Sequence, residues 1–292
     1  MEHVRASTLL LSEHLQMGKA KKQGIRESQA RLAKARRSGQ DKLVAEYHHH
    51  IGVLLKKDGQ LEEAMQHFSE GASVAEKIGE YASLCSNLRL LAETSCMPQS
   101  DNADQSEDEK QCRQHLKRLQ EATEKWANPA QKQLLLSTTV SCLRQLARND
   151  DPRLLFEAME KATESLEFLE KHGKEIDGMK AEVEIGGNSS FRKALQYSVL
   201  ANVYAALDMR ESAEESLETA LGEIEDGCPL YGRQETAADF KWDCLMTQIC
   251  FSWRDRNDVI EEISQLAAKS NRKQWMATAE LLQFQTSAFL YN

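Results

Sequence analysis

Small and large apolar residues alternate along residues 45–76 in a pattern that predicts two helices packed against each other. A turn at Asp58 and Gly59 divides the segment, and apolar residues on each side recur every three or four positions, which is the spacing of one helical face. Small residues are expected where the helices approach closely, and large ones where side chains fill the gap between them. The small residues are Gly52, Ala64 and Gly71, and the large ones are Ile51, Leu55 and Phe68.

The same pattern returns from Ala194 onward. Its members are Tyr197, Leu200, Ala201 and Tyr204, a turn at Asp208, Met209 and Arg210, and then Ala213, Leu217 and Ala220. Both segments fit one 34-residue template, so the chain resembles the tetratricopeptide repeat family. The resemblance implies an all-α fold, a right-handed superhelical stack of antiparallel helix pairs with a concave inner face.

Helical periodicity continues between the remaining helix breakers, and no segment predicts a strand. The predicted helices cover 25–37, 41–57, 60–78, 80–95, 106–127, 131–148, 152–172, 190–207, 210–225, 232–254, 257–269 and 272–290. The polar, acidic segment 97–110 is predicted to be a loop, and the glycine-rich segment 172–190 either connects helices or folds back over the groove. We therefore expect a partly basic N-terminal extension at 1–24 and a single solenoid over 25–291, with irregular insertions at 97–110 and 172–190.

Composition indicates the cellular compartment of the protein and bears on whether it crosses a membrane. The seven cysteines form no CxxC pair, which favours a reducing compartment, nuclear or cytoplasmic. No run of 18 apolar residues exists, so no membrane-spanning helix is expected.

Charge is distributed unevenly. The chain has a net charge of -9, yet residues 19–37 contain eight basic residues and one acid. Two clusters in this segment have the spacing of a bipartite nuclear-import signal; they comprise Lys21 and Lys22, and then Lys34, Arg36 and Arg37. The alternatives are a solvated helix face and direct contact with nucleic acid. No recognition-helix, zinc-finger or stacking-aromatic pattern supports the last of these.

Patterns for catalysis or cofactor binding are missing from the sequence. His48, His49 and His50 are consecutive, so on a helix they point about 100° apart and cannot share one metal ion. No GxSxG, HExxH or glycine-rich phosphate loop is present. We therefore expect a protein that is not an enzyme, with no cofactor and no metal site.

The repeat resemblance implies a groove for a protein or peptide partner, because the first helices of successive pairs line the inner face. The residues at the corresponding positions are Glu46, His49, Val53, Lys56 and Lys57 in the first segment, and Leu195, Ser198 and Asn202 in the second. Members of the family that hold a chaperone's terminal carboxylate use Lys and Asn where this chain has His49 and Val53. An extended or helical peptide is therefore favoured over a chaperone tail.

Residues 30–93 resemble the opening repeats of Tonsoku-like proteins. The likeness rests on residues 32–39, 51–55 and 78–79, together with Gly59, Glu63, Ala64 and His67. It implies a scaffold for recombination repair at damaged replication forks, in the nucleus. A cytoplasmic adaptor for spindle, vesicle or motor complexes is the alternative, and an enzyme with an unrecognised site is a third.

Overall fold

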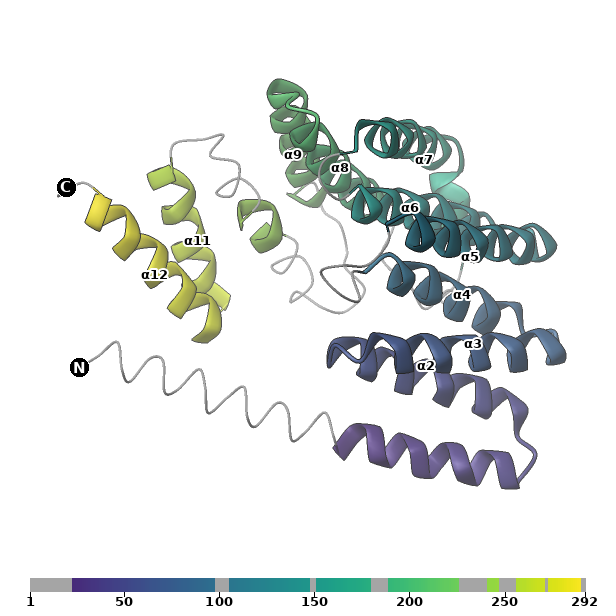
Figure 1. The fold of residues 1–292 in the computed structure, drawn as a ribbon. Helices are drawn as coiled ribbons and strands as arrows, with labels where there is room; N and C mark the ends of the chain where they lie inside the picture. The colour runs from purple at the N-terminus through teal and green to yellow at the C-terminus, as the bar shows by residue number, and fades with distance from the viewer. Residues whose placement is uncertain are drawn as a thin grey trace. The chain divides into compact units, whose positions relative to one another are not determined.

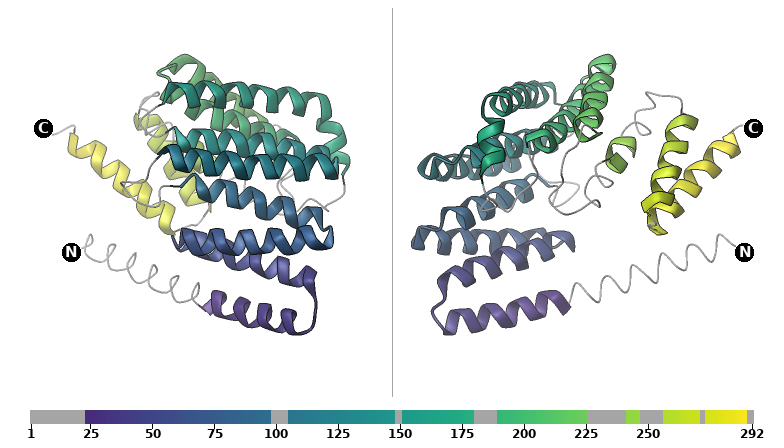
Figure 2. Two further views of the ribbon diagram at one scale, coloured as in Figure 1. Left: turned by 45° about the vertical axis from the view of Figure 1, so that its right-hand side comes forward. Right: turned by 180° about the vertical axis from the view of Figure 1, so that it is seen from behind.

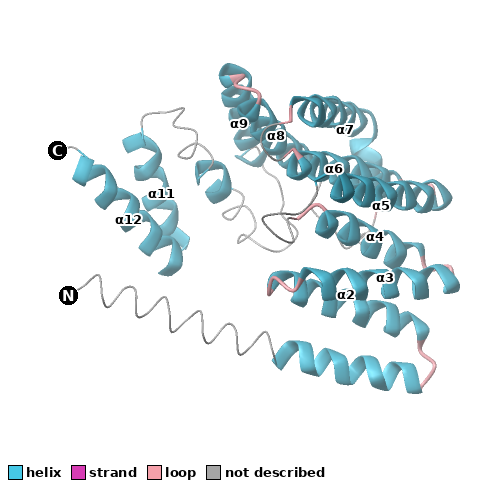
Figure 3. Cartoon of the chain, viewed as in Figure 1, coloured by secondary structure: helices cyan, strands magenta, loops and turns pink. Residues whose placement is uncertain are grey.

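The computed structural model describes residues 23–97, 105–147, 151–179, 189–225, 241–246, 256–270 and 273–289. All regular structure in these ranges is helical, as predicted (Figure 3). The chain divides into two compact units, one within Ser12–Glu184 and one within Ile185–Asn292, which are described separately. None of the described helices has the length and apolar character needed to cross a membrane.

The first unit is a stack of helices in which each packs on the next along the chain (Figures 1 and 2). A helix over 23–37 is followed by α2 (Asp41–Lys57), α3 (Leu61–Ile78), α4 (Tyr81–Ser95), α5 (Gln105–Trp126), α6 (Pro129–Leu146) and α7 (Pro152–Gly178). Helix α4 also contacts both α2 and α6, so these three helices form one layer of the stack. The core continues from helix to helix through Leu32, Val44, Ile51, Phe68 and Leu91.

Three turns of the first unit have the same conformation. Gly39, Gly59 and Gly79 each have a φ between 65° and 80°, the left-handed region in which a side chain would be strained. The next residue donates its N–H to a carbonyl five residues earlier each time, which closes the preceding helix in a Schellman turn. The glycines are 20 residues apart, so a helix pair repeats every 40 residues here, a longer period than the 34-residue template.

The second unit contains α8 (Ser189–Ala206), α9 (Arg210–Glu225), a helical segment at 241–246, α11 (Arg256–Ser270) and α12 (Lys273–Phe289). The turn between α8 and α9 repeats the Schellman bond, with Met209 N–H donating to the Tyr204 carbonyl. Asp208, with a φ of 58°, stands where the other turns have glycine. The predicted small residues Ala201, Ala213 and Ala220 are fully buried.

Helices α2 and α3 approach each other as closely as the small-residue pattern predicts. A Cβ atom added to Gly52 on α2 would lie 2.5 Å from the ring of Phe68 on α3. Gly71 on α3 instead approaches α4, because a Cβ atom added there would lie 2.7 Å from Asn87 Oδ1. Ala64 and Phe68 are completely buried. The predicted close approach of the two helices is therefore confirmed at Gly52, whereas the prediction for Gly71 was wrong, since this residue lies against α4.

The structure departs from the predicted boundaries in two places. Helix α7 continues to Gly178, six residues beyond the predicted end, because Gly173 and Ile176 remain buried on its inner face. Helix α5 begins at Gln105, inside the segment predicted to be an irregular insertion; residues 98–104 and 180–188 lie outside the described residues. The handedness of the stack and the single solenoid over 25–291 stay predictions.

Replacing Gly52 by Ala should destabilise the first unit by about 1–3 kcal/mol, because the new methyl group must displace the buried ring of Phe68. Gly24→Ala is the matched control: it also adds a methyl group to a helix of this unit, but at 3.6 Å from Leu54. Chemical denaturation should show a lower free energy of unfolding for the Gly52 variant alone. Equal midpoints for both variants would contradict the close approach of α2 and α3.

Asp208→Gly should stabilise the second unit by about 0.5–1 kcal/mol, because glycine adopts the left-handed conformation of this turn without steric cost. Asp208→Ala should have the opposite effect, since alanine keeps the Cβ atom and lacks the polar side chain that makes this conformation tolerable for Asp. Urea denaturation of the three proteins measures the order. An alanine variant as stable as the glycine variant would contradict the assigned turn.

Candidate functional site

The structure places the predicted groove residues of α2 on a partly exposed face. Glu46 and Lys57 are exposed, while His49, Val53 and Lys56 are half-buried. Lys56 Nζ lies 3.2 Å from Glu93 Oε2, so this lysine joins α2 to α4. A substitution at Lys56 would consequently disturb helix packing as well as any partner contact.

The other predicted groove residues lie on α8, in the second unit. Leu195 is exposed, and Ser198 and Asn202 are half-buried. Asn202 Nδ2 donates to the Ser198 carbonyl at 2.9 Å. Because the two sets of residues belong to different units, the continuous groove that would join them stays a prediction.

Only part of the predicted import signal falls in the described residues. Lys21 and Lys22 lie outside them, whereas Lys34, Arg36 and Arg37 are exposed on the helix over 23–37. Arg36 Nη2 donates to Glu70 Oε2 at 3.0 Å and to His48 Nε2 at 2.8 Å. This arginine therefore has a structural role in addition to any role in import.

His48 forms a buried polar network that sequence adjacency did not reveal. Its Nδ1 lies 3.1 Å from Nδ1 of His67, which is 19 residues away on α3. The guanidinium of Arg36 can only donate, so Nε2 of neutral His48 accepts and its Nδ1–H donates to His67. Burial lowers the pKa of His48 to about 4, although nearby Glu70 favours the charged ring.

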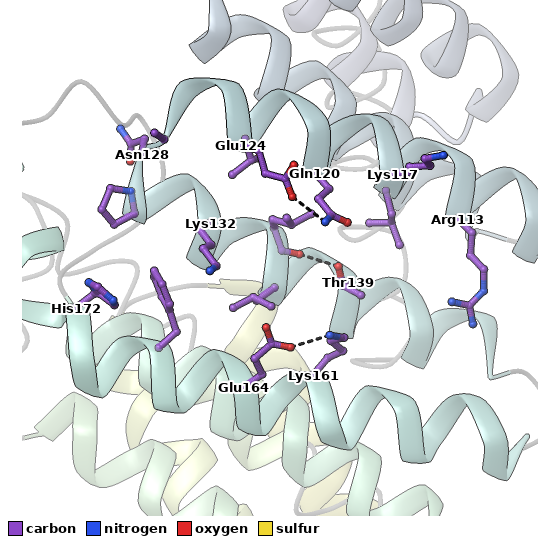
Figure 4. Close-up of a pocket in the computed structure, with 17 residues that line it drawn as sticks. Arg113, Lys117, Gln120, Glu124, Asn128, Lys132, Thr139, Lys161, Glu164 and His172 are labelled. Atoms are coloured by element: carbon purple, nitrogen blue, oxygen red, sulfur yellow. Dashed lines mark hydrogen bonds and ion pairs between the residues drawn. The ribbon is translucent and has the colours of Figure 1, made fainter.

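A pocket of about 680 Å³ lies on the first unit, with walls from α5 and α7 and a floor from α6 (Figure 4). Its lining extends along α5 from Arg113 to Ala127 and along α7 from Lys161 to His172. At 1.5 Å per residue these stretches are about 21 Å and about 16 Å long, so the pocket is an elongated groove. None of the groove residues predicted from the repeat resemblance lines it.

The α5–α7 groove has an apolar floor and a cationic rim. The floor includes Pro129, Leu135 and Leu136 on α6, and the apolar lining continues onto the walls through Leu116 on α5 and Phe168 on α7. Lys132 lies over the ring of Phe168, with Nζ at 5.2 Å from the ring centroid. Lys117 is exposed on the α5 wall and makes no ion pair within the described residues. The acids of the lining are already engaged, since Glu124 accepts from Gln120 and Glu164 pairs with Lys161.

An ion-pair network joins the two walls at one end of the groove. Arg113 on α5 donates two hydrogen bonds to the carboxylate of Glu157 on α7, at 2.9 and 2.6 Å. Arg153 makes a similar two-bond contact with Glu109, at 3.0 and 2.7 Å. Hydrogen bonds from Arg153 and then Arg113 lower the pKa of Glu109 to about 2. Two bidentate arginine–glutamate pairs thus link α5 to α7, and the planar geometry of such pairs favours one relative position of the two helices.

Three cysteines converge in the core between α4, α5 and α6. Cys96 follows the last residue of α4, Cys112 lies on α5 and Cys142 lies on α6. All three are buried, and their sulfur atoms lie within 4.8 Å of one another. Hydrogen bonds from Cys142 and Cys96 lower the pKa of Cys112 to about 4, while those of Cys96 and Cys142 are raised. The three cysteines are 16 and 30 residues apart in the sequence, so no short motif indicates the cluster. From the sequence we expect them only to be buried core residues.

Comparison with protein-family models gives no match, and comparison with curated proteins gives no significant one.

Acidification should destabilise the first unit through His48. Its folded-state pKa of about 4 is below the ordinary value near 6.5, so the folded state binds fewer protons between these values. The stabilisation is complete above the unfolded-state pKa and is lost as the pH falls toward the folded-state pKa. His67, whose pKa burial also lowers, adds to the effect.

His48→Gln should therefore flatten the decline of the melting temperature between about pH 7 and about pH 5. His50→Gln removes a histidine from an exposed position of the same helix and serves as the control. Differential scanning fluorimetry across this range measures both slopes. A His48 variant with the slope of the parent protein would contradict the assigned role of its ring.

Proposed function

We propose that this protein is a non-catalytic scaffold that binds a peptide or helix of a protein partner in the α5–α7 groove. The observation that carries the proposal is the shape and lining of that groove, which is elongated, apolar at its floor and walled by two helices that ion pairs link at one end. An amphipathic helix laid into such a groove buries its apolar face at i, i+3 and i+4 positions.

The charges of the groove favour an acidic partner. Lys117 and Lys132 stand on its α5 and α6 sides, and no carboxylate of the described residues contacts either one. Glu124 and Glu164, by contrast, are already hydrogen-bonded within the protein. A ligand carboxylate near either lysine would gain electrostatic attraction without displacing an existing ion pair. We therefore propose a segment that combines Leu or Phe side chains with Asp or Glu.

The face of α2 that carries Glu46, His49 and Val53 remains a second candidate for partner binding. Its support is that α2, α4 and α6 contact one another and form one layer, as the inner helices of a repeat stack do. The α5–α7 groove is preferred because it is a defined cavity, whereas Lys56 on the α2 face is already paired with Glu93.

The cellular role is proposed on the sequence alone. The resemblance of residues 30–93 to Tonsoku-like proteins supports a nuclear scaffold in genome maintenance, and the basic segment that includes Lys34, Arg36 and Arg37 supports nuclear import. A cytoplasmic adaptor is the alternative, and localisation of a fluorescent fusion distinguishes the two.

Peptides selected against the full chain by display from a random library test the groove. Selected sequences should combine apolar residues at helical spacing with acidic residues. Lys117→Glu combined with Lys132→Glu should weaken a selected peptide by about tenfold or more, because attraction at the rim becomes repulsion. Fluorescence polarisation at low and high salt measures the change.

The matched control is Lys171→Glu combined with Lys174→Glu, which changes the net charge equally at exposed positions of α7 outside the groove lining. It should bind the peptide nearly as well as the parent protein. Equal weakening by both double variants would show that only overall charge matters. Basic or uncharged selected peptides would also contradict the proposal.

A further inference from the structure

We propose that Cys96, Cys112 and Cys142 bind a structural zinc ion that joins α4, α5 and α6, with His115 as the fourth ligand. The proposal is independent of the partner groove, because it rests on the buried sulfur cluster and not on the surface of the unit.

The sulfur atoms lie close to the spacing of a zinc site. Zinc bonds thiolate sulfur at about 2.3 Å in tetrahedral geometry, which places the sulfurs of one site about 3.8 Å apart. Here Cys96 Sγ and Cys112 Sγ are 2.9 Å apart, and all three sulfurs lie within 4.8 Å of one another. The spacing that zinc requires falls between these distances, so small side-chain rotations suffice to form the site.

His115 lies one helical turn beyond Cys112 on α5, and residues three apart on a helix share a face. Its Nδ1 atom is shielded from solvent and has no hydrogen-bond partner within the described residues. A buried ring nitrogen without a partner is costly, and coordination of a metal would satisfy it. Its nitrogens do not belong to the group of mutually close ligand atoms, which holds the three cysteines alone among the described residues, so the side chain must rotate toward the sulfurs. That rotation would complete a Cys₃His set, one of the ordinary ligand sets of structural zinc sites.

The chemistry of the donors suits zinc. Three thiolates are soft ligands, which disfavours magnesium and calcium, and three cysteines with one histidine form a tetrahedral set that is typical of structural zinc sites. The three sulfurs come from the C-terminal end of α4, from α5 and from α6, so one ion would cross-link the middle of the stack. Because the site is buried, zinc would enter as the unit folds, and its binding energy would add to folding stability.

Elemental analysis of the full chain, purified under reducing conditions and then supplied with zinc, gives the direct test. We expect one zinc ion per chain and, after replacement with cobalt, the absorption of a tetrahedral cobalt–thiolate centre. Chelation should lower the melting temperature. A reduced protein that binds no zinc would overturn the proposal.

Variants then identify the ligands. Cys112→Ser and Cys142→Ser should each lose the bound zinc, whereas Cys85→Ser should retain it, since Cys85 is buried in α4 of the same unit but lies outside the cluster. His115→Ala should weaken zinc binding while the cobalt–thiolate absorption persists; unchanged affinity would overturn its assignment. If a cluster variant fails to fold, alkylation of the parent protein in moderate urea, where the buried cysteines become transiently accessible, decides. Zinc must slow the labelling of Cys96, Cys112 and Cys142, and equal labelling rates with and without zinc overturn the site.

Discussion

The close contact between Gly52 and the ring of Phe68 is the constraint on which the first unit depends. With no side chain at Gly52, α2 and α3 approach until the aromatic ring fills the space that a Cβ atom would need. That approach fixes the separation of the hairpin, and the glycine turns at 39, 59 and 79 then bring each following helix into a similar arrangement. Each helix buries its apolar face only against its neighbours, so an error in one contact would be passed along the stack.

The sequence could predict this part of the fold because the relevant signals are local. Apolar residues at helical spacing indicate which face is buried, and Gly59 and Asp208 indicate where the chain turns. Local signals did not predict the end of α7, because the sequence of its glycine-rich extension is typical of a connecting loop. Burial of Gly173 and Ile176 against neighbouring helices stabilises helix where local preference does not.

The candidate sites depend on contacts between residues far apart in the chain, and sequence reasoning recovered little of them. Consecutive histidines drew attention to His48, but its partners are His67 and Arg36, on other helices. The residues around Arg113 in the sequence do not predict its pairing with Glu157, which links the two walls of the α5–α7 groove. The three clustered cysteines share no motif, since each comes from a different helix. Spacing along one helix could have linked only Cys112 to His115.

The central functional claim is that a partner segment occupies the groove formed by α5, α6 and α7. Hydrogen–deuterium exchange of the full chain, with and without a saturating peptide selected by display, tests this claim most directly. Binding should slow amide exchange in residues 113–139 and 161–172, because the occupied groove suppresses local opening of its walls. Slowed exchange confined to α2, around Glu46 to Lys57, would contradict the claim and place the partner on the face predicted from the repeat resemblance.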